Sequence, residues 1–252
     1  MTSQRWQQLL AGEVAKHYRS AGKFAYHFAK NKVRYDSLSR DVFAAGLNID
    51  SHEAEVDLLD LGAGQGLLAM AMLTAQRLHA QGQWPQVWVA KKHLPLRVLS
   101  CHGIEYSAAN VARAQSAFAE LDPQHLRLSC VQGNIVNAPY PTAKTIALID
   151  VLHYLNYAEQ EQVLLRVRSV IAPQGQLLLR VGDAEARQSN RISQQIDRVV
   201  SRWRGTDNGE ICCRGLSQWL LLLKKLGFVP RITSSVRSTF FSNVMIVAEL
   251  PQ

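Results

Sequence analysis

The sequence predicts an α/β fold, in which buried strands form a sheet and helices pack against it. The apolar run Val56–Leu61 ends in a glycine-rich turn, and an apolar helical pattern begins at Leu67. Further along the chain, short apolar runs alternate with helical patterns, as in sheets whose strands are joined by helices. The length of 252 residues suits one such domain with a small appendage.

The glycine-rich turn predicts a ligand site. Glycines at positions 62, 64 and 66 allow backbone angles that other residues avoid, and they let a ligand lie against the main chain. The free N–H groups at the start of the following helix favour an anionic group. The spacing excludes the dinucleotide motif G-x-G-x-x-G, whose third glycine would fall on Leu67. The turn also lacks the Gly-Lys-Ser/Thr ending of a phosphate-binding P-loop.

The pattern D-x-G-x-G-x-G, from Asp60 to Gly66, resembles the first motif of the class I S-adenosylmethionine-dependent methyltransferases. The resemblance implies a Rossmann-like methyltransferase fold, with a mostly parallel seven-stranded sheet, an antiparallel last strand and helices on both faces. It also implies S-adenosyl-L-methionine as the cofactor, with the first contacts made by Asp60, Gly62, Ala63, Gly64 and Gly66. A glycine-rich turn in another kind of α/β protein is the alternative.

A second strand is expected to end at Glu105, where Ser107 can cap the helix that follows through Leu121. A carboxylate at this strand end can accept hydrogen bonds from both ribose hydroxyls, as in dinucleotide-binding folds. We therefore expect Glu105 to bind the ribose and Tyr106 to lie against the adenine.

The third strand, about 126–131, precedes Gly133-Asn134-Ile135. The family usually has an aspartate at the position of Asn134, where it binds the adenine amino group. An asparagine carbonyl can accept the same hydrogen bond. Asn134 and Ile135 are therefore predicted cofactor residues.

The fourth strand, 145–149, leads into Asp150-Val151-Leu152-His153-Tyr154-Leu155. This segment resembles the D-V-L-H-x-L segment of small-molecule methyltransferases, which borders the methionine end of the cofactor. The resemblance makes Asp150 a predicted cofactor residue. His153 is the first candidate for a catalytic base, because histidine titrates near neutral pH; a pocket wall or a structural role is the alternative. Tyr154 is expected to shape the substrate site.

The remaining elements follow the family order. A helix over 158–170, a strand over 176–181 and a helix over 217–225, capped by Ser217, precede two strands over 229–235 and 242–249. Pro230 cannot donate a hydrogen bond to a neighbouring strand, so the first of these two should be an edge strand. Helical spacing also occurs in the arginine-rich stretch from Asp183 to about Thr206.

Two segments add to the family pattern. Residues 1–50 are predicted to form an N-terminal helical cap on the methyltransferase domain of residues 51–252. Phe24, His27, Phe28 and Lys32 share one helical face, which favours packing on the core; a lid over the substrate is a compatible alternative. Residues 82–96 are interpreted as an insertion, with an extra strand over 87–90.

Composition and charge limit the classes of protein to which the chain can belong. The chain is 47% hydrophobic and has no apolar run near the ~20 residues of a membrane span. It begins without a secretion-signal pattern, so the cytoplasm is the expected location. Its four cysteines show no zinc spacing and are expected to be reduced, and no metal cluster is visible. The formal charge of +8 is scattered rather than gathered in a basic stripe.

The function predicted from these features is methyl transfer to a small molecule, with a phenolic or aryl acceptor as one candidate, free or bound to a carrier protein. Weaker similarities over Tyr18–Phe24, Cys213–Trp219 and Phe241–Val244 resemble methyltransferases that accompany bacterial aryl polyene pathways. One alternative is an RNA or DNA methyltransferase, although Asp150–His153 differs from the N/D-P-P-Y/F motif of amine methylation on bases. The other alternative is a methyltransferase-like binding protein without turnover.

Overall fold

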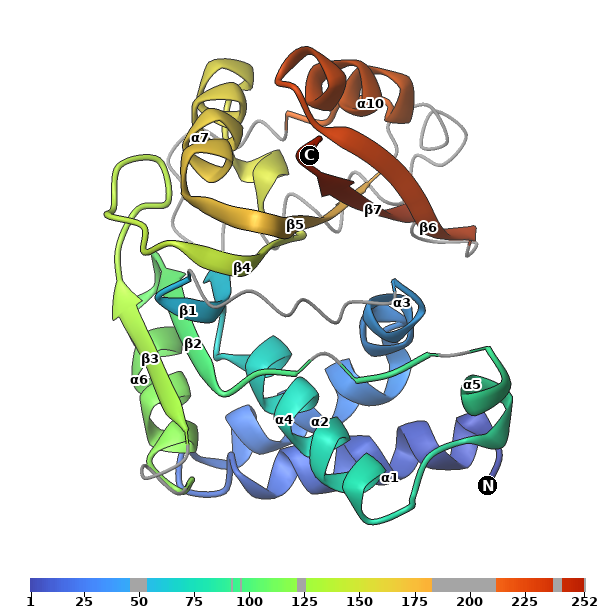
Figure 1. Cartoon of the computed structure of the whole chain (residues 1–252). Coiled ribbons are helices and arrows are strands. Elements are labelled where there is room, and N and C mark those ends of the chain that lie inside the picture. Colours follow the sequence, from blue (N-terminus) through green and yellow to red (C-terminus); the bar gives the residue numbers. More distant parts are fainter. Residues whose placement is uncertain are drawn as a thin grey trace.

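The sheet has seven strands in the order β3-β2-β1-β4-β5-β7-β6 (Figure 1). The computed structural model describes residues 1–45, 54–91, 93–95, 97–121, 126–182, 212–237 and 242–251. The strands are β1 (Val56–Leu61), β2 (Ser100–Glu105), β3 (Arg127–Gln132), β4 (Ala143–Ile149), β5 (Ile171–Gly182), β6 (Val229–Arg237) and β7 (Ser242–Glu249).

Strand direction confirms the predicted Rossmann-like methyltransferase fold. β1 pairs in parallel with both β2 and β4, and the parallel pairing extends to β3 and β5. β7 lies between β5 and β6 and is antiparallel to both. β6, which contains Pro230, is therefore an edge strand, as its missing N–H donor predicts. Since β1, β2 and β4 are parallel neighbours, the segments that follow them emerge at the same edge of the sheet.

Helices cover both faces of the sheet, as expected (Figure 1). Alternate residues of β1 face opposite ways: Leu58 joins the core beneath α4 (Leu67–Ala80), and Leu59 joins the core beneath α7 (Tyr157–Val170) and α10 (Leu216–Lys225). α6 (Ala108–Phe118) packs on β2 and β3, and Ser107 caps it as predicted. The cap of α10 is Gly215 rather than Ser217, because the helix begins earlier than its hydrophobic spacing indicated.

Three N-terminal helices pack on the α4 side: α1 (Ser3–Lys16), α2 (Lys23–Tyr35) and α3 (Leu38–Ala44). The expected packing face of α2 was wrong. Small residues of α2 are buried (Ala25, Ala29, Val33), whereas Phe24 and Phe28 remain 51% and 41% exposed. Small side chains let α2 lie close to α1, and the larger apolar side chains are left on the outer face.

The predicted strand over 87–90 was also wrong, because the segment forms the short helix α5 (Gln86–Ala90). Trp88 and Trp84 pack edge-on to Trp6 of α1, with ring centroids 4.8 and 4.9 Å apart, and Phe43 of α3 closes the cluster. The Trp6 indole N–H donates to the carbonyl of Gln83 at 2.6 Å. The tryptophans of the insertion therefore pack against the N-terminal helices α1 and α3.

Some sequence expectations fall outside the described residues, among them the helical pattern from Asp183 to Thr206. All four cysteines are free, as expected. Within the described part of the chain, the helices lack the length and apolarity that crossing a bilayer requires.

We predict that Trp88→Ala lowers the free energy of unfolding by about 3–5 kcal/mol, because it removes a large side chain from a buried aromatic cluster. Val87→Ala on the exposed side of the same helix should change it by less than about 0.5 kcal/mol. Urea unfolding of the two variants measures this difference. Equal effects would show that the insertion does not anchor the N-terminal helices.

Candidate functional site

The glycine turn lies across the end of β2. The amides of Gly62 and Ala63 both donate to the Ile104 carbonyl, at 2.8 and 3.1 Å. Gly62, Gly64 and Gly66 have φ values of 81°, 57° and 76°, which non-glycine residues rarely adopt. The turn therefore depends on glycine at each of these positions, and α4 begins directly after Gly66.

The Glu105 carboxylate holds the turn in place. One of its oxygens accepts from the Gly64 amide at 2.8 Å, and the other accepts from the Ser107 amide at 2.9 Å. The Asn110 side-chain amide lies 3.5 Å from the second oxygen. The Glu105 carboxylate thus connects the glycine turn to the start of α6. Glu105 and Gly64, which were predicted from separate motifs, are in direct contact.

Two glycines of the turn, Gly62 and Gly64, differ in how much space surrounds them. A Cβ on Gly62 would lie 2.6 Å from a methyl group of Val151, so this glycine allows the turn to pack against the segment after β4. A Cβ on Gly64 would meet no described atom within 4 Å. The main chain at Gly64 is therefore open to close approach by a ligand.

Asp60 lies on β1, directly behind the turn, and its side chain is buried. Burial and the nearby charge of Glu105 raise the pKa of Asp60 from its usual value near 3.8 to about 7. A group positively charged at this end of the sheet would favour the ionised form. A positively charged ligand bound nearby would therefore lower the pKa of Asp60, although the Asp60 side chain itself is buried.

The residues predicted to surround the adenine lie at the ends of β2 and β3. Tyr106 is 65% exposed, so its ring is accessible beside Glu105. The Asn134 side-chain oxygen accepts from the Val136 amide at 2.9 Å, and this oxygen retains a second lone pair for another donor. Ile135 is buried in the core with Ile104 and fixes the loop after β3 rather than presenting an open surface.

The segment after β4 brings Asp150, His153 and Tyr154 to the same edge of the sheet. Asp150 has a φ of 53°, unusual for a non-glycine residue. A short 3₁₀ turn, η1 (Leu152–Tyr154), follows it. The rings of His153 and Tyr154 are half-buried, with centroids 4.0 Å apart.

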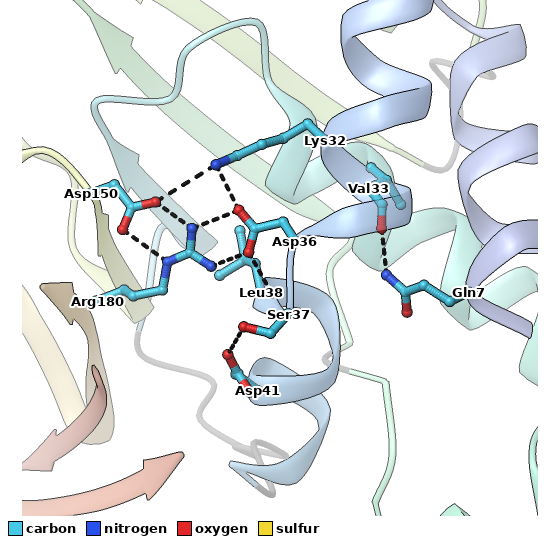
Figure 2. Close-up of polar contacts among 9 residues, drawn as sticks. All are labelled: Gln7, Lys32, Val33, Asp36, Ser37, Leu38, Asp41, Asp150 and Arg180. Atoms are coloured by element: carbon cyan, nitrogen blue, oxygen red, sulfur yellow. Dashed lines mark hydrogen bonds and ion pairs between the residues drawn. The ribbon is translucent and has the colours of Figure 1, made fainter. Parts of the chain in front are cut away.

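An ion-pair cluster around Asp150 was missed in the sequence analysis (Figure 2). Arg180 of β5 is 1% exposed, and its guanidinium donates to both Asp150 and Asp36. Lys32 of α2 lies 2.6 Å from an Asp36 oxygen and 3.8 Å from an Asp150 oxygen. An arginine inside an otherwise apolar strand was the available signal, because a buried guanidinium requires carboxylate partners.

Hydrogen bonds also join the N-terminal segment to the glycine turn. The buried Tyr18 hydroxyl donates to the Gln65 carbonyl at 2.9 Å, and the Gln65 side chain donates to the Ala25 carbonyl at 3.2 Å. Burial raises the pKa of Tyr18 well above its usual range, so the hydroxyl keeps its proton. The placement of α2 is therefore coupled to the conformation of the turn.

The exposed face of α2 lines a hollow of about 610 Å³. Its lining residues are Lys23, Phe24, His27, Phe28, Asn31 and Lys32. At one end, Arg113 of α6 lies over the Phe24 ring, 4.9 Å from its centroid; at the other end, Lys32 approaches Asp150. The hollow is thus lined by one face of α2, whose first turn contacts α6 and whose last turn approaches the segment after β4.

The structure therefore brings the glycine turn, Glu105, Asp150 and the η1 segment to one edge of the sheet and places α2 beside them. Arg34, near the end of α2, is exposed next to Tyr35 and does not line the hollow. Within the described ranges, histidine, cysteine and acidic side chains form no group of three or more that could hold a metal ion.

Residues 87–179 match the model of a family described as a methyltransferase domain. The matched segment runs from α5 into β5 and begins after the glycine turn. It therefore includes Glu105, Asn134 and Asp150 but not the glycine motif from Asp60 to Gly66. No curated protein sequence matches the chain.

Solved structures similar to the chain include several methyltransferases. Magnesium protoporphyrin IX methyltransferase from Synechocystis PCC 6803, with bound SAH, aligns over 94% of each chain at 15% identity and a TM-score of 0.56. Human N-acetylserotonin methyltransferase, in complex with SAM, aligns over 95% of this chain and 59% of its own at 17% identity and a TM-score of 0.56. A glycopeptide N-methyltransferase complexed with sinefungin covers 85% of this chain and 93% of its own, at 16% identity and a TM-score of 0.54. These similarities show the class I methyltransferase fold.

The raised pKa of Asp60 predicts a pH-dependent effect of Asp60→Asn. Between about pH 4 and pH 7 the folded protein binds a proton at Asp60 that the unfolded chain releases, so this residue's contribution to stability falls as the pH rises. At about 1.4 kcal/mol per pH unit, the loss reaches as much as about 4 kcal/mol above pH 7.

The side-chain amide introduced by Asp60→Asn cannot ionise, so this variant should gain stability relative to the wild type at pH 8 compared with pH 5. Urea unfolding of both proteins at these two values measures the change, and contributions from other groups cancel in the difference. The same difference at both pH values would contradict the raised pKa.

Proposed function

We propose that the protein is an S-adenosylmethionine-dependent methyltransferase that acts on a small-molecule acceptor. The observation that carries this proposal is the contact between the Gly64 amide and the Glu105 carboxylate at the ends of adjacent parallel strands. Ligands of open α/β sheets bind at the carboxyl ends of the strands. The methyltransferase family match and the methyltransferase fold support the same conclusion.

The residues at this edge fit the chemistry of the cofactor. The open main chain at Gly64 admits a ligand, and Glu105 offers oxygen acceptors to the ribose hydroxyls. Tyr106 and Asn134 are proposed to contact the adenine, with Ile135 supporting the loop after β3 that carries Asn134. We propose that Asp150, in the segment after β4, lies beside the amino-acid end of the cofactor, and that the positive charge of the bound cofactor favours the ionised form of Asp60 behind the glycine turn.

An aromatic acceptor is supported by the hollow beside α2. Its volume of about 610 Å³ lies in the range of small-molecule pockets. Phe24 and Phe28 form a stacked pair with centroids 5.9 Å apart, which provides a flat apolar wall. We propose a phenolic or aryl acceptor here, either free or bound to a carrier protein, and α1–α3 as the cap over it. The resemblance to aryl polyene methyltransferases stays a prediction.

S-adenosylmethionine, when bound, supplies an electrophilic methyl group. The chain's own contribution is to hold the acceptor in line with that group and to exclude water, and such positioning is worth up to about 7–11 kcal/mol. The cap helices provide the water-excluding side of the site. His153 is proposed to take the proton from the acceptor oxygen or nitrogen, with Tyr154 shaping the wall beside it.

We predict that the protein binds S-adenosylmethionine in calorimetry but does not bind NAD. Glu105→Ala should weaken cofactor affinity at least tenfold, because it removes the ribose acceptor and frees the glycine turn. Gly64→Val should abolish binding, because a β-branched residue cannot easily adopt a φ of 57°.

Glu249→Ala is the control, because it makes the same chemical change at the opposite edge of the sheet. Glu249 pairs with Gln176, which in turn pairs with Thr145 near the start of β4. This variant should bind as the wild type does. Wild-type affinity in both Glu105→Ala and Gly64→Val would show that the site is elsewhere. Conversion to S-adenosylhomocysteine with free and carrier-bound aryl acids separates an enzyme from a binding protein that lacks turnover.

The proposed base predicts a change in the pH profile. His153→Ala should lower kcat/KM about 100-fold on an aryl acceptor that turns over, and the rise of kcat/KM with pH that a general base produces should disappear. Tyr154→Phe should change KM for the acceptor while keeping the profile. A His153→Ala variant with an unchanged pH profile would assign His153 to the pocket wall instead.

A further inference from the structure

The cluster of Lys32, Asp36, Asp150 and Arg180 joins two parts of the chain that are far apart in sequence (Figure 2). We call it the Arg180 cluster. Arg180 lies near the end of β5, and its carbonyl accepts from the Asp150 amide at 3.1 Å. Asp150 is therefore bound to Arg180 through both its main chain and its side chain. The Arg180 guanidinium also donates to Asp36, in the N-terminal segment.

Asp36 occupies the junction between α2 and α3. Its amide donates to the Lys32 carbonyl at 3.0 Å, which ends α2, and its carboxylate accepts from the Leu38 amide at 2.9 Å, which starts α3. The Arg180 Nη2 donates to the same carboxylate at 2.8 Å, and Nη1 donates to its other oxygen. Burial alone would raise the pKa of Asp36, but hydrogen bonds and charge from Arg180 and Lys32 outweigh it and hold the pKa well below its usual range.

α1 and the end of α2 are held in place by different kinds of contact. α1 is anchored by Trp6 and, just beyond its last turn, by Tyr18, and both side chains are large and fully buried. α2 packs on α1 through the small side chains Ala25, Ala29 and Val33, and the Gln7 side chain of α1 donates to the Val33 carbonyl in the last turn of α2. The Arg180 cluster adds a direct attachment of the end of α2 to β5, and the buried Trp6 and Tyr18 side chains that anchor α1 are not part of it.

We propose that Asp36 and Arg180 are positioning residues that hold α2 closed over the strand ends, and that the cofactor is bound tightly only in this closed arrangement. The proposal rests on the proposed function, since it takes the strand ends as the cofactor site. A ligand that favours the closed arrangement must also stabilise it, by thermodynamic linkage. Weakening the Asp36–Arg180 contact should therefore loosen α2 and lower cofactor affinity together.

The test uses the full-length protein and S-adenosylhomocysteine as the probe. Amide hydrogen exchange and calorimetry are compared for the wild type, Asp36→Asn, Asp36→Glu and Glu249→Gln. Asp36→Asn should speed the exchange of residues 31–35 at least tenfold without changing α1 or α4, and it should weaken S-adenosylhomocysteine affinity about tenfold. Saturating S-adenosylhomocysteine should restore the slow exchange. Asp36→Glu, which keeps the charge, should fall between Asp36→Asn and the wild type.

Glu249→Gln is the matched control, because it makes the same chemical change in the solvent-exposed pair of Glu249 with Arg231. It should leave both measurements unchanged. Wild-type affinity and α2 exchange in Asp36→Asn would overturn the proposal while leaving the proposed function intact. Faster exchange throughout the chain, or in α2 without recovery on ligand binding, would assign the cluster a purely structural role and also overturn it. Failure of the wild type to bind the probe would remove the proposed function and this inference with it.

Discussion

The architecture of the site depends on one contact, in which the Glu105 carboxylate bridges the Gly64 amide and the Ser107 amide. This contact sets the glycine turn across the end of β2 and aligns the starts of α4 and α6. Because the turn is fixed, Gly62 can pack against Val151, which brings the segment after β4 to the same place. The ends of β1, β2 and β4 thus converge through the Glu105 carboxylate and the close packing of Gly62 on Val151.

The N-terminal helices complete this edge through three separate attachments. An aromatic cluster centred on Trp6 holds α1 and α3 to the 82–96 insertion, and the Tyr18 hydroxyl binds the glycine turn itself. The Arg180 cluster connects the end of α2 to β4 and β5. The first attachment is apolar and insensitive to ligand charge, whereas the last includes Asp150, a proposed cofactor residue. Because of this difference, we expect α1 to stay fixed when a ligand binds, whereas the closure of α2 should respond to the ligand.

Much of this arrangement was predictable from the sequence. The strands, the glycine turn and the position of Glu105 follow from apolar runs ended by glycine or an acidic residue, and Pro230 identified the edge strand. The segment around Trp88 was misread because five residues are too short to show periodicity, and Val87 and Val89 favour a strand by composition. The face of α2 was misread because two faces were apolar, and contact with α1 selected the one with smaller side chains. The Asp36–Arg180 pair joins positions 144 residues apart, a separation that local patterns do not reveal.

The central claim is that the edge formed by the ends of β1, β2 and β4, closed by α2, is where the cofactor binds. A crystal structure with S-adenosylhomocysteine tests it most directly. The account predicts that the ribose hydroxyls lie within hydrogen-bonding distance of Glu105, that the amino-acid end lies beside Asp150, and that α2 covers the ligand. A nucleoside bound on another surface, or one whose sugar is remote from Glu105, would contradict the account.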